Sequence, residues 1–344
     1  MFAASMAVVL PLALSACGGG DQSAEGSSSS SSSSTQAQGE CPTDPVKVVA
    51  SVDQWGGIVS QLGGACADVT TILAGSSVDP HDYEPAPSDA AKFDGAQFVV
   101  INGGHYDEWA SQLASSSAPS APVISAVELT EGREGEAGHD HEGEAGHDHE
   151  GEDPAHAGEE AGHDHAGEGN PHVWYNPATV TAVAEAVTAE LGKLAPDAAG
   201  YFEEQHTAFE TTMKPYNDTL AALKAGAAGK RYVATESVFD DMAAAIGMQN
   251  VTPEGYQVSS SNETDPSPAD LDAFLQLLAA KGADVLIYNT QTEGSVPEQI
   301  RSAAEAAGIP VVDVTETLPP GTTSFETWQV AQLDALAKAL GVTA

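Results

Sequence analysis

The sequence predicts an α/β protein made of two lobes that one long helix joins. Strand-like runs alternate with helical segments in residues 45–126 and again in residues 230–341. Strands that alternate with helices are typical of parallel sheets, so each half predicts one α/β lobe. Between the halves, residues 195–226 carry apolar side chains at roughly helical spacing, which predicts the connection.

The first lobe is expected over residues 43–195. Residues 45–52, PVKVVASV, are β-rich, and residues 53–64 follow with apolar side chains at helical spacing. Further strands are expected at 68–73, 96–103 and 121–126.

The second lobe is expected over residues 227–344, with the same alternation. Its predicted strands are 230–237, 284–290 and 309–317. Its predicted helices are 238–247, 268–282, 297–308 and 325–341. The connecting helix between the lobes is assigned to 196–226, where we expect Asp197 to cap it. Pro215 should kink this helix, because proline removes a backbone donor and clashes with the preceding turn.

The N-terminus reads as an export signal. Residues 1–17 form an apolar run that ends in Leu-Ser-Ala-Cys, which fits the site where bacterial lipoproteins are cleaved and acylated, here on Cys17. The usual basic segment before the apolar run is missing, and a transmembrane anchor is the alternative, although the run is short for one. The Gly- and Ser-rich residues 18–42 predict a flexible tether. We therefore expect a protein lipid-anchored to the outer face of the cytoplasmic membrane, with no other membrane contact.

Two further cysteines, Cys41 and Cys66, form an even pair in an exported chain. This favours a disulfide that ties the start of the fold to the segment before the second strand. Two free thiols are the alternative.

The charge of the chain restricts its partners. Eleven Lys and Arg stand against fifty-one Asp and Glu, a formal net charge of −40. Such a surface repels nucleic acid and anionic membranes, and it suits cations. Solubility alone is the other explanation of the acidity.

A histidine-rich tract occupies residues 131–169. The octapeptide EGEAGHDH occurs at 134–141 and again at 142–149, and the tract lacks large apolar residues, so it predicts an unfolded loop inserted in the first lobe. Its seven histidines are expected to bind additional zinc weakly: His139, His141, His147, His149, His156, His163 and His165. A solvated loop without a metal role is the alternative.

Two histidines outside this tract stand in proline-framed loops. His81 lies in VDPHDYEP and His172 in NPHVWYNP, and the prolines reduce the freedom that each loop loses on binding. Two such imidazoles suggest a divalent metal site, although a lone loop histidine is usually only a surface residue. His105 and His206 receive no role.

A resemblance adds to these residues. DPHDYEPAPSD, VVINGGHYDEW, the histidine-rich insert, NPHVWYNPATV, ATESVFDDMAAAIG and VPEQIRSAAEAAGIPVVDVTET occur in the order seen in one family. Over about residues 45–340 the chain resembles the cluster A-I metal-binding lipoproteins, the zinc or manganese solute-binding components of ABC importers.

The resemblance implies two Rossmann-like lobes, one long connecting helix and a metal site between the lobes. It implies four ligands, His81, His172, Glu236 and Glu316, where Glu316 in Thr-Glu-Thr replaces the family's more frequent Asp. Two neutral imidazoles and two carboxylates would leave a divalent ion charge-neutral, which lowers the cost of burying it. Without the resemblance, both glutamates read as helix caps or surface carboxylates.

Three other residues are candidates for the surroundings of this site. Tyr83, Trp174 and Asn289 are expected to line the cleft or orient ligands, with core packing as the alternative for Trp174.

The expected function is capture of Zn²⁺ and its delivery to an ABC permease and its ATPase, by a monomer that binds no nucleic acid. Manganese is the alternative cargo, because Glu236 in place of a third histidine makes the ligand set richer in oxygen. A metal-dependent hydrolase is a second class, but four protein ligands leave little room for reactive water and no HExxH spacing occurs. We therefore expect no enzyme activity. A surface adhesin is a third class, but no segment resembles an exposed array of ligand-binding strands.

Overall fold

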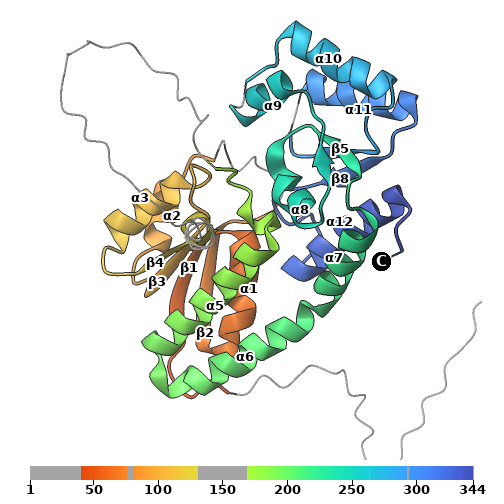
Figure 1. The fold of residues 1–344 in the computed structure, drawn as a ribbon. Coiled ribbons are helices and arrows are strands. Elements are labelled where there is room, and N and C mark those ends of the chain that lie inside the picture. The colour runs from red at the N-terminus through yellow and green to blue at the C-terminus, as the bar shows by residue number, and fades with distance from the viewer. Residues whose placement is uncertain are drawn as a thin grey trace, which may run out of the picture. The chain divides into compact units, whose positions relative to one another are not determined.

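The computed structural model describes residues 40–75, 81, 83–130, 169–262, 264–292 and 294–343. The predicted signal segment 1–17 with Cys17, most of the tether 18–42 and the histidine-rich tract with its seven histidines lie outside these residues. The described residues form two four-stranded parallel sheets with helices packed against them (Figure 1). The prediction of two α/β lobes is therefore confirmed.

The first sheet has the strand order β2-β1-β3-β4, and all of its pairs are parallel. Its strands are β1 (Val46–Val52), β2 (Ala67–Leu73), β3 (Phe98–Ile101) and β4 (Val123–Ser125). β2 lies on one side of β1 and β3 on the other, so the strand order reverses beside β1. Ligands bind beyond the carboxyl ends of parallel strands at such a reversal of strand order.

The second sheet repeats this topology with the order β6-β5-β7-β8. Its strands are β5 (Arg231–Ala234), β6 (Gln249–Asn250), β7 (Val285–Asn289) and β8 (Val311–Val314). β6 was not predicted, because two exposed polar residues at an edge carry no strand pattern.

Helices cover both faces of each sheet. In the first lobe they are α1 (Asp53–Gly63), α2 (Pro87–Lys92), α3 (Glu108–Ser117) and α5 (Pro177–Leu194). In the second lobe they are α8 (Asp240–Ala245), α9 (Glu254–Ser261), α10 (Pro268–Ala279), α11 (Ser295–Ala307) and α12 (Phe325–Leu340). Within the described part of the chain, no helix has both the length and the apolar character needed to cross a bilayer.

The connection between the lobes is helical but interrupted. It consists of α6 (Ala199–Thr212) and α7 (Lys214–Gly226), with Met213 between them. Pro215 is the second residue of α7, so the break falls where the sequence predicts a kink. The predicted cap was wrong: Asp197 lies inside a 3-10 turn, Pro196–Ala198, and α6 starts after it without a side-chain cap.

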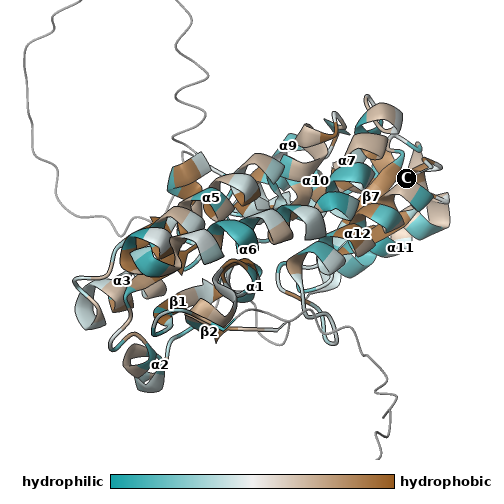
Figure 2. Cartoon of the chain, turned by 90° about the horizontal axis from the view of Figure 1, so that it is seen from below, coloured by the Kyte–Doolittle hydropathy of each residue, from teal (hydrophilic) through white to brown (hydrophobic). Residues whose placement is uncertain are grey.

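Among the described residues, the largest of three apolar clusters runs through both lobes and their connection. It includes Trp55 on α1, Met213 and Tyr216 at the helix break, and Phe325 and Trp328 on α12, all nearly or fully buried. In Figure 2, β7 is mostly brown, whereas α6 is mostly teal to white, in keeping with its role as a cover over this core. Because interiors are close-packed, we expect this shared core to restrict movement between the two lobes.

The structure joins Cys41 to Cys66 by a disulfide, the pairing that the sequence favours. The bond closes a loop over a sequence separation of 25 residues. In the chain-entropy account, replacing both cysteines by serine should lower the free energy of unfolding by about 3 kcal/mol. Urea denaturation of the double variant measures the loss. As a control, a reductant should lower the free energy of unfolding of the parent protein by a similar amount and leave that of the double variant unchanged. A double variant with the same urea midpoint as the parent would contradict the expectation.

Candidate metal site

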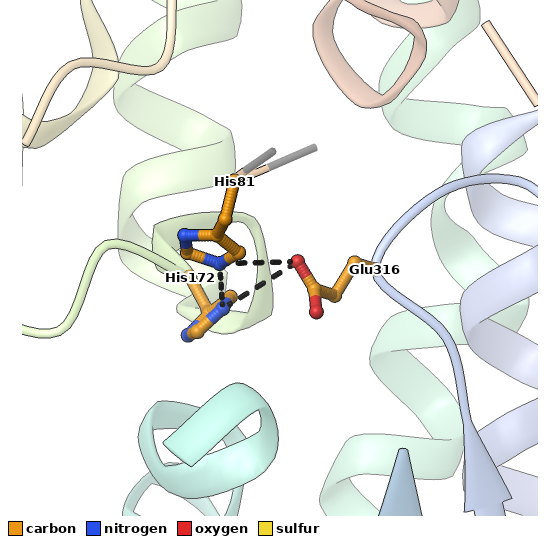
Figure 3. A group of neighbouring side chains, drawn as sticks. All are labelled: His81, His172 and Glu316. Carbon is orange, nitrogen blue, oxygen red and sulfur yellow. Dashed lines mark hydrogen bonds and ion pairs between the residues drawn. The ribbon is translucent and has the colours of Figure 1, made fainter. Parts of the chain in front are cut away.

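Three of the four predicted ligands meet at one point. One ligand atom each from His81, His172 and Glu316 lies within 4.8 Å of the others (Figure 3). His81 Nε2 lies 3.3 Å from His172 Nε2 and 3.4 Å from Glu316 Oε2. His172 Nε2 lies 3.6 Å from Glu316 Oε2. Two imidazoles from the first lobe therefore face one carboxylate from the second.

The fold explains this convergence. His81 follows β2, and Glu316 follows β8, so both stand beyond the carboxyl ends of parallel strands. His172 directly precedes a 3-10 turn, Val173–Tyr175, which leads into α5. Asn176 caps α5 by accepting a hydrogen bond from the Ala178 N–H, which fixes where the turn ends.

Asn170 selects the tautomer of His172. Its Oδ1 accepts from His172 Nδ1 at 2.8 Å, so Nδ1 carries the proton and Nε2 presents a lone pair towards His81 and Glu316. The Asn170 amide also donates to the Ser237 carbonyl of the second lobe at 3.0 Å. Partners of this kind orient metal-bound histidines. This role of Asn170 was not predicted, although Asn170 is the first residue of NPHVWYNP.

Hydrogen bonds hold the main chain of Glu316, and one of its carboxylate oxygens faces the imidazoles. Gln291 Oε1 accepts from its N–H at 2.6 Å, and Gln54 Nε2 donates to its carbonyl at 2.7 Å. Asn289 Nδ2 donates to Oε1 at 2.8 Å. Oε2 is buried, lies near Nε2 of both imidazoles and accepts no hydrogen bond from the described residues. Such an orphaned oxygen is the atom that a cation would take.

Electrostatics keep Glu316 ionised. Burial raises the pKa of its carboxyl group. The protonated forms of His172 and His81, which would donate hydrogen bonds to it and carry positive charge, lower that pKa well below its usual range. The carboxylate is therefore negative at the pH at which it would meet a cation.

Aromatic rings form the wall behind the histidines. The Tyr106 ring lies edge-on to His81, at 4.9 Å between ring centroids, and its hydroxyl accepts from Gln54 Nε2 at 3.3 Å. The Trp174 ring lies 5.3 Å from His172 and 4.8 Å from Tyr106, and it is fully buried. Trp174 is thus a core residue that also backs a ligand. Burial raises the pKa of Tyr106 well above its usual value, so its hydroxyl stays neutral.

Glu236, the fourth predicted ligand, lies beside this group rather than in it. Both of its oxygens are hydrogen-bonded within the second lobe: Asn289 Nδ2 donates to Oε2 at 2.5 Å, and the Thr292 hydroxyl donates to Oε1. The same Asn289 amide reaches Glu316, so it links the two carboxylates. Burial first, and then repulsion from Glu316, raise the pKa of Glu236.

His105, His206 and Tyr83 make contacts other than with the three ligand atoms. His105 pairs with Glu108 at 3.2 Å on the surface, and His206 is half-buried on α6. Tyr83 donates to Asp89 and packs on Trp109, contacts that hold it against α2 and α3.

The spacing of the three ligand atoms suits a four-coordinate zinc ion. A tetrahedron's edge is about 1.6 times its bond length, so zinc bonds of about 2.0–2.1 Å give edges of about 3.3–3.4 Å. The observed separations of 3.3, 3.4 and 3.6 Å lie close to these edges. The three atoms therefore outline one face of a tetrahedron, whose fourth corner is left for another ligand.

We expect Asp240, the first residue of α8, to make the stability of the protein depend on pH. Burial is the main cause that raises its pKa from 3.8 to about 6. Between these pH values the folded state binds more protons than the unfolded state, so stability falls as pH rises from about 4 to 6. Asp240→Asn should therefore raise the free energy of unfolding at pH 7.5. Each pKa unit corresponds to about 1.4 kcal/mol, and solvent screening of the partly exposed Asp240 reduces the expected gain to about 2 kcal/mol.

Urea denaturation of metal-free protein from pH 4 to 7.5 measures this effect. The free energy of unfolding of the variant should fall less with rising pH than that of its parent. If both free energies fall equally, Asp240 does not contribute to the decline.

Comparison with protein families gives one match over most of the chain. The model of the family described as ZnuA, zinc-uptake complex component A, periplasmic, matches residues 48–339. The high-affinity zinc uptake system protein ZnuA of Bacillus subtilis is 26% identical over 235 residues, which cover 67% of each chain. The zinc-binding lipoprotein AdcA of Streptococcus pneumoniae is 26% identical over 216 residues, which cover 61% of this chain and only 38% of AdcA.

Solved structures share the fold. The periplasmic zinc-binding protein TroA of Treponema pallidum superposes with a TM-score of 0.64 at 18% identity, over 87% of this chain and 99% of TroA. The solute-binding protein FpvC of Pseudomonas aeruginosa, in complex with Mn²⁺, has a TM-score of 0.63 at 22% identity, over 87% of this chain and 99% of FpvC. Two α/β lobes with this topology are thus a known architecture.

Proposed function

Since the chain belongs to the family of zinc-uptake complex component A, we propose that it captures Zn²⁺ outside the cytoplasm and delivers it to an ABC-type importer. The ion would be cargo, held between the lobes by His81, His172, Glu316 and Glu236.

One observation carries this proposal. The Nε2 atoms of two histidines and Oε2 of Glu316 converge at tetrahedral spacing, and that oxygen is buried without a hydrogen-bond donor among the described residues. A divalent cation would satisfy the oxygen and offset the repulsion between Glu316 and Glu236, which raises the pKa of Glu236.

Glu236 is proposed as the fourth ligand. Asn289 links it to Glu316, and a movement of its side chain would bring it to the ion once Thr292 rotates away. Two imidazoles and two carboxylates would make the site neutral around a divalent ion, which favours burial.

We propose binding rather than catalysis. Catalytic zinc sites keep one position open for water, whereas four protein ligands fill a tetrahedron. Members of this family are solute-binding components of metal uptake systems, in keeping with this proposal.

Partners and location are proposed from the family and from the sequence. The family is described as periplasmic, and AdcA is named a lipoprotein, which supports export and acylation at Cys17. We propose that the chain is a monomer and acts with a permease and its ATPase. Because it spans 38% of AdcA, whatever AdcA does through its remaining length does not transfer to this chain.

Zinc is proposed over manganese as the cargo. The near-tetrahedral edges favour zinc, and so does the order of affinities, in which nitrogen and oxygen sites bind Zn²⁺ more tightly than Mn²⁺. The histidines of residues 131–169 are proposed as weak auxiliary zinc sites. Manganese remains the alternative because two of the four ligands are carboxylates.

Calorimetric titration of the purified protein with Zn²⁺ and Mn²⁺ tests the proposal. A matched variant lacking residues 131–168 isolates the tight site from the auxiliary ones. We expect one tight zinc site in both proteins, weaker additional sites only in the parent, and weaker manganese binding. A variant that retains the fold but lacks tight zinc binding would refute the proposed function.

A further inference from the structure

Asn289 holds two carboxylates with one amide. It ends β7, where the strand order of the second sheet reverses, and it is 2% exposed. Its Nδ2 donates to Glu236 Oε2 at 2.5 Å and to Glu316 Oε1 at 2.8 Å. Both N–H bonds of the amide are therefore used, one on each carboxylate.

The orientation of this amide is fixed. Asn289 Oδ1 accepts from the Gln291 N–H at 3.1 Å, and the Asn289 N–H donates to the Thr235 hydroxyl at 3.1 Å. Because the side-chain oxygen is held by a main-chain donor, the NH₂ group has to face the carboxylates.

The two hydrogen bonds restrict what each carboxylate offers to a cation. An N–H on one oxygen occupies a lone pair there and places a positive hydrogen beside it, which directs a cation to the other oxygen. For Glu316 that other oxygen is Oε2, which faces both histidines. For Glu236 it is Oε1, whose present partner is the Thr292 hydroxyl, a group that can rotate.

We propose that Asn289 determines metal specificity by keeping both carboxylates monodentate, which limits the site to four ligand atoms. This inference rests on the proposed function and on its ligand set. Zn²⁺ accepts four ligands in a tetrahedron, whereas manganese suits sites rich in carboxylate and water with six oxygen ligands. Without the amide, either carboxylate could bind through both oxygens, and the higher coordination number would favour manganese.

Asn289→Leu removes both donors at similar side-chain size, and Co²⁺ is the probe of geometry. Tetrahedral cobalt absorbs visible light far more strongly than six-coordinate cobalt. Cobalt in the parent should show intense visible bands, and cobalt in the variant weak ones. Competition titrations should also show the ratio of zinc to manganese affinity falling by about tenfold or more, as expected when a hydrogen bond to a ligand is lost. Asn217→Leu, on the exposed face of α7, is the matched control and should leave both readouts unchanged.

Asn289→Ser keeps the inference testable if leucine prevents folding, because a serine hydroxyl has a single hydrogen and cannot donate to both carboxylates. Circular dichroism checks the fold of each variant. A folded variant with the parent's cobalt spectrum and the parent's ratio of affinities would overturn the role of Asn289. A parent protein that binds neither zinc nor cobalt tightly would instead refute the proposed function itself.

Discussion

Replacing His172 by alanine should abolish tight zinc binding. His172 is 5% exposed, and its Nε2 points to His81 and Glu316 because Nδ1 donates to Asn170. Its removal would leave the buried Glu316 carboxylate without its partner, which should weaken the free energy of zinc binding by about 3–5 kcal/mol. That corresponds to about two to four orders of magnitude in the dissociation constant. Competition with a chromophoric zinc chelator measures it, on protein lacking residues 131–168 so that only the tight site contributes.

His105→Ala is the control for this variant. His105 lies on the surface with Glu108, so its loss removes one imidazole without touching the site. We expect it to bind zinc as the parent does. A His172→Ala variant within about threefold of the parent would remove His172 from the ligand set.

Replacing Trp174 by alanine should have the largest effect on stability. Trp174 is fully buried, contacts the rings of His172 and Tyr106, and belongs to the core that both lobes share. Truncating a large buried aromatic side chain costs about 3–5 kcal/mol. Urea denaturation of the metal-free variant should show this loss. Zinc affinity should fall as well, because His172 would lose the ring behind it.

Two further variants test whether the loss of stability follows the apolar volume that is removed from the core. Trp174→Phe keeps most of the apolar volume and should lose less stability than alanine. Trp109→Ala removes a half-buried tryptophan of α3 and should also cost less. An unchanged urea midpoint in Trp174→Ala would mean that the shared core does not depend on this side chain.

The fold was predictable because its pattern is strong. Apolar strands alternate with helices of clear periodicity, and β1, β2, β7 and α1 lie within a few residues of their predicted bounds. What failed has a local cause. β6 is too short and polar to carry a pattern.

The site was predictable only in part. The loops that carry His81 and His172 stand out by their prolines, whereas Glu236 and Glu316 required the family resemblance. Tertiary partners were beyond the sequence: Gln54 meets Glu316 across 262 residues of chain, and Asn170 meets Ser237 across 67. Such pairs depend on which strand ends adjoin in the folded protein, and local spacing does not encode this.

Anomalous diffraction at the zinc edge from zinc-loaded crystals tests the central claim most directly. We predict a strong peak between the lobes, at about 2.0–2.2 Å from Nε2 of His81, Nε2 of His172 and Oε2 of Glu316, with Glu236 as the fourth ligand. Zinc peaks only on the histidines of residues 131–169, with His81, His172 and Glu316 bound to no metal, would contradict it.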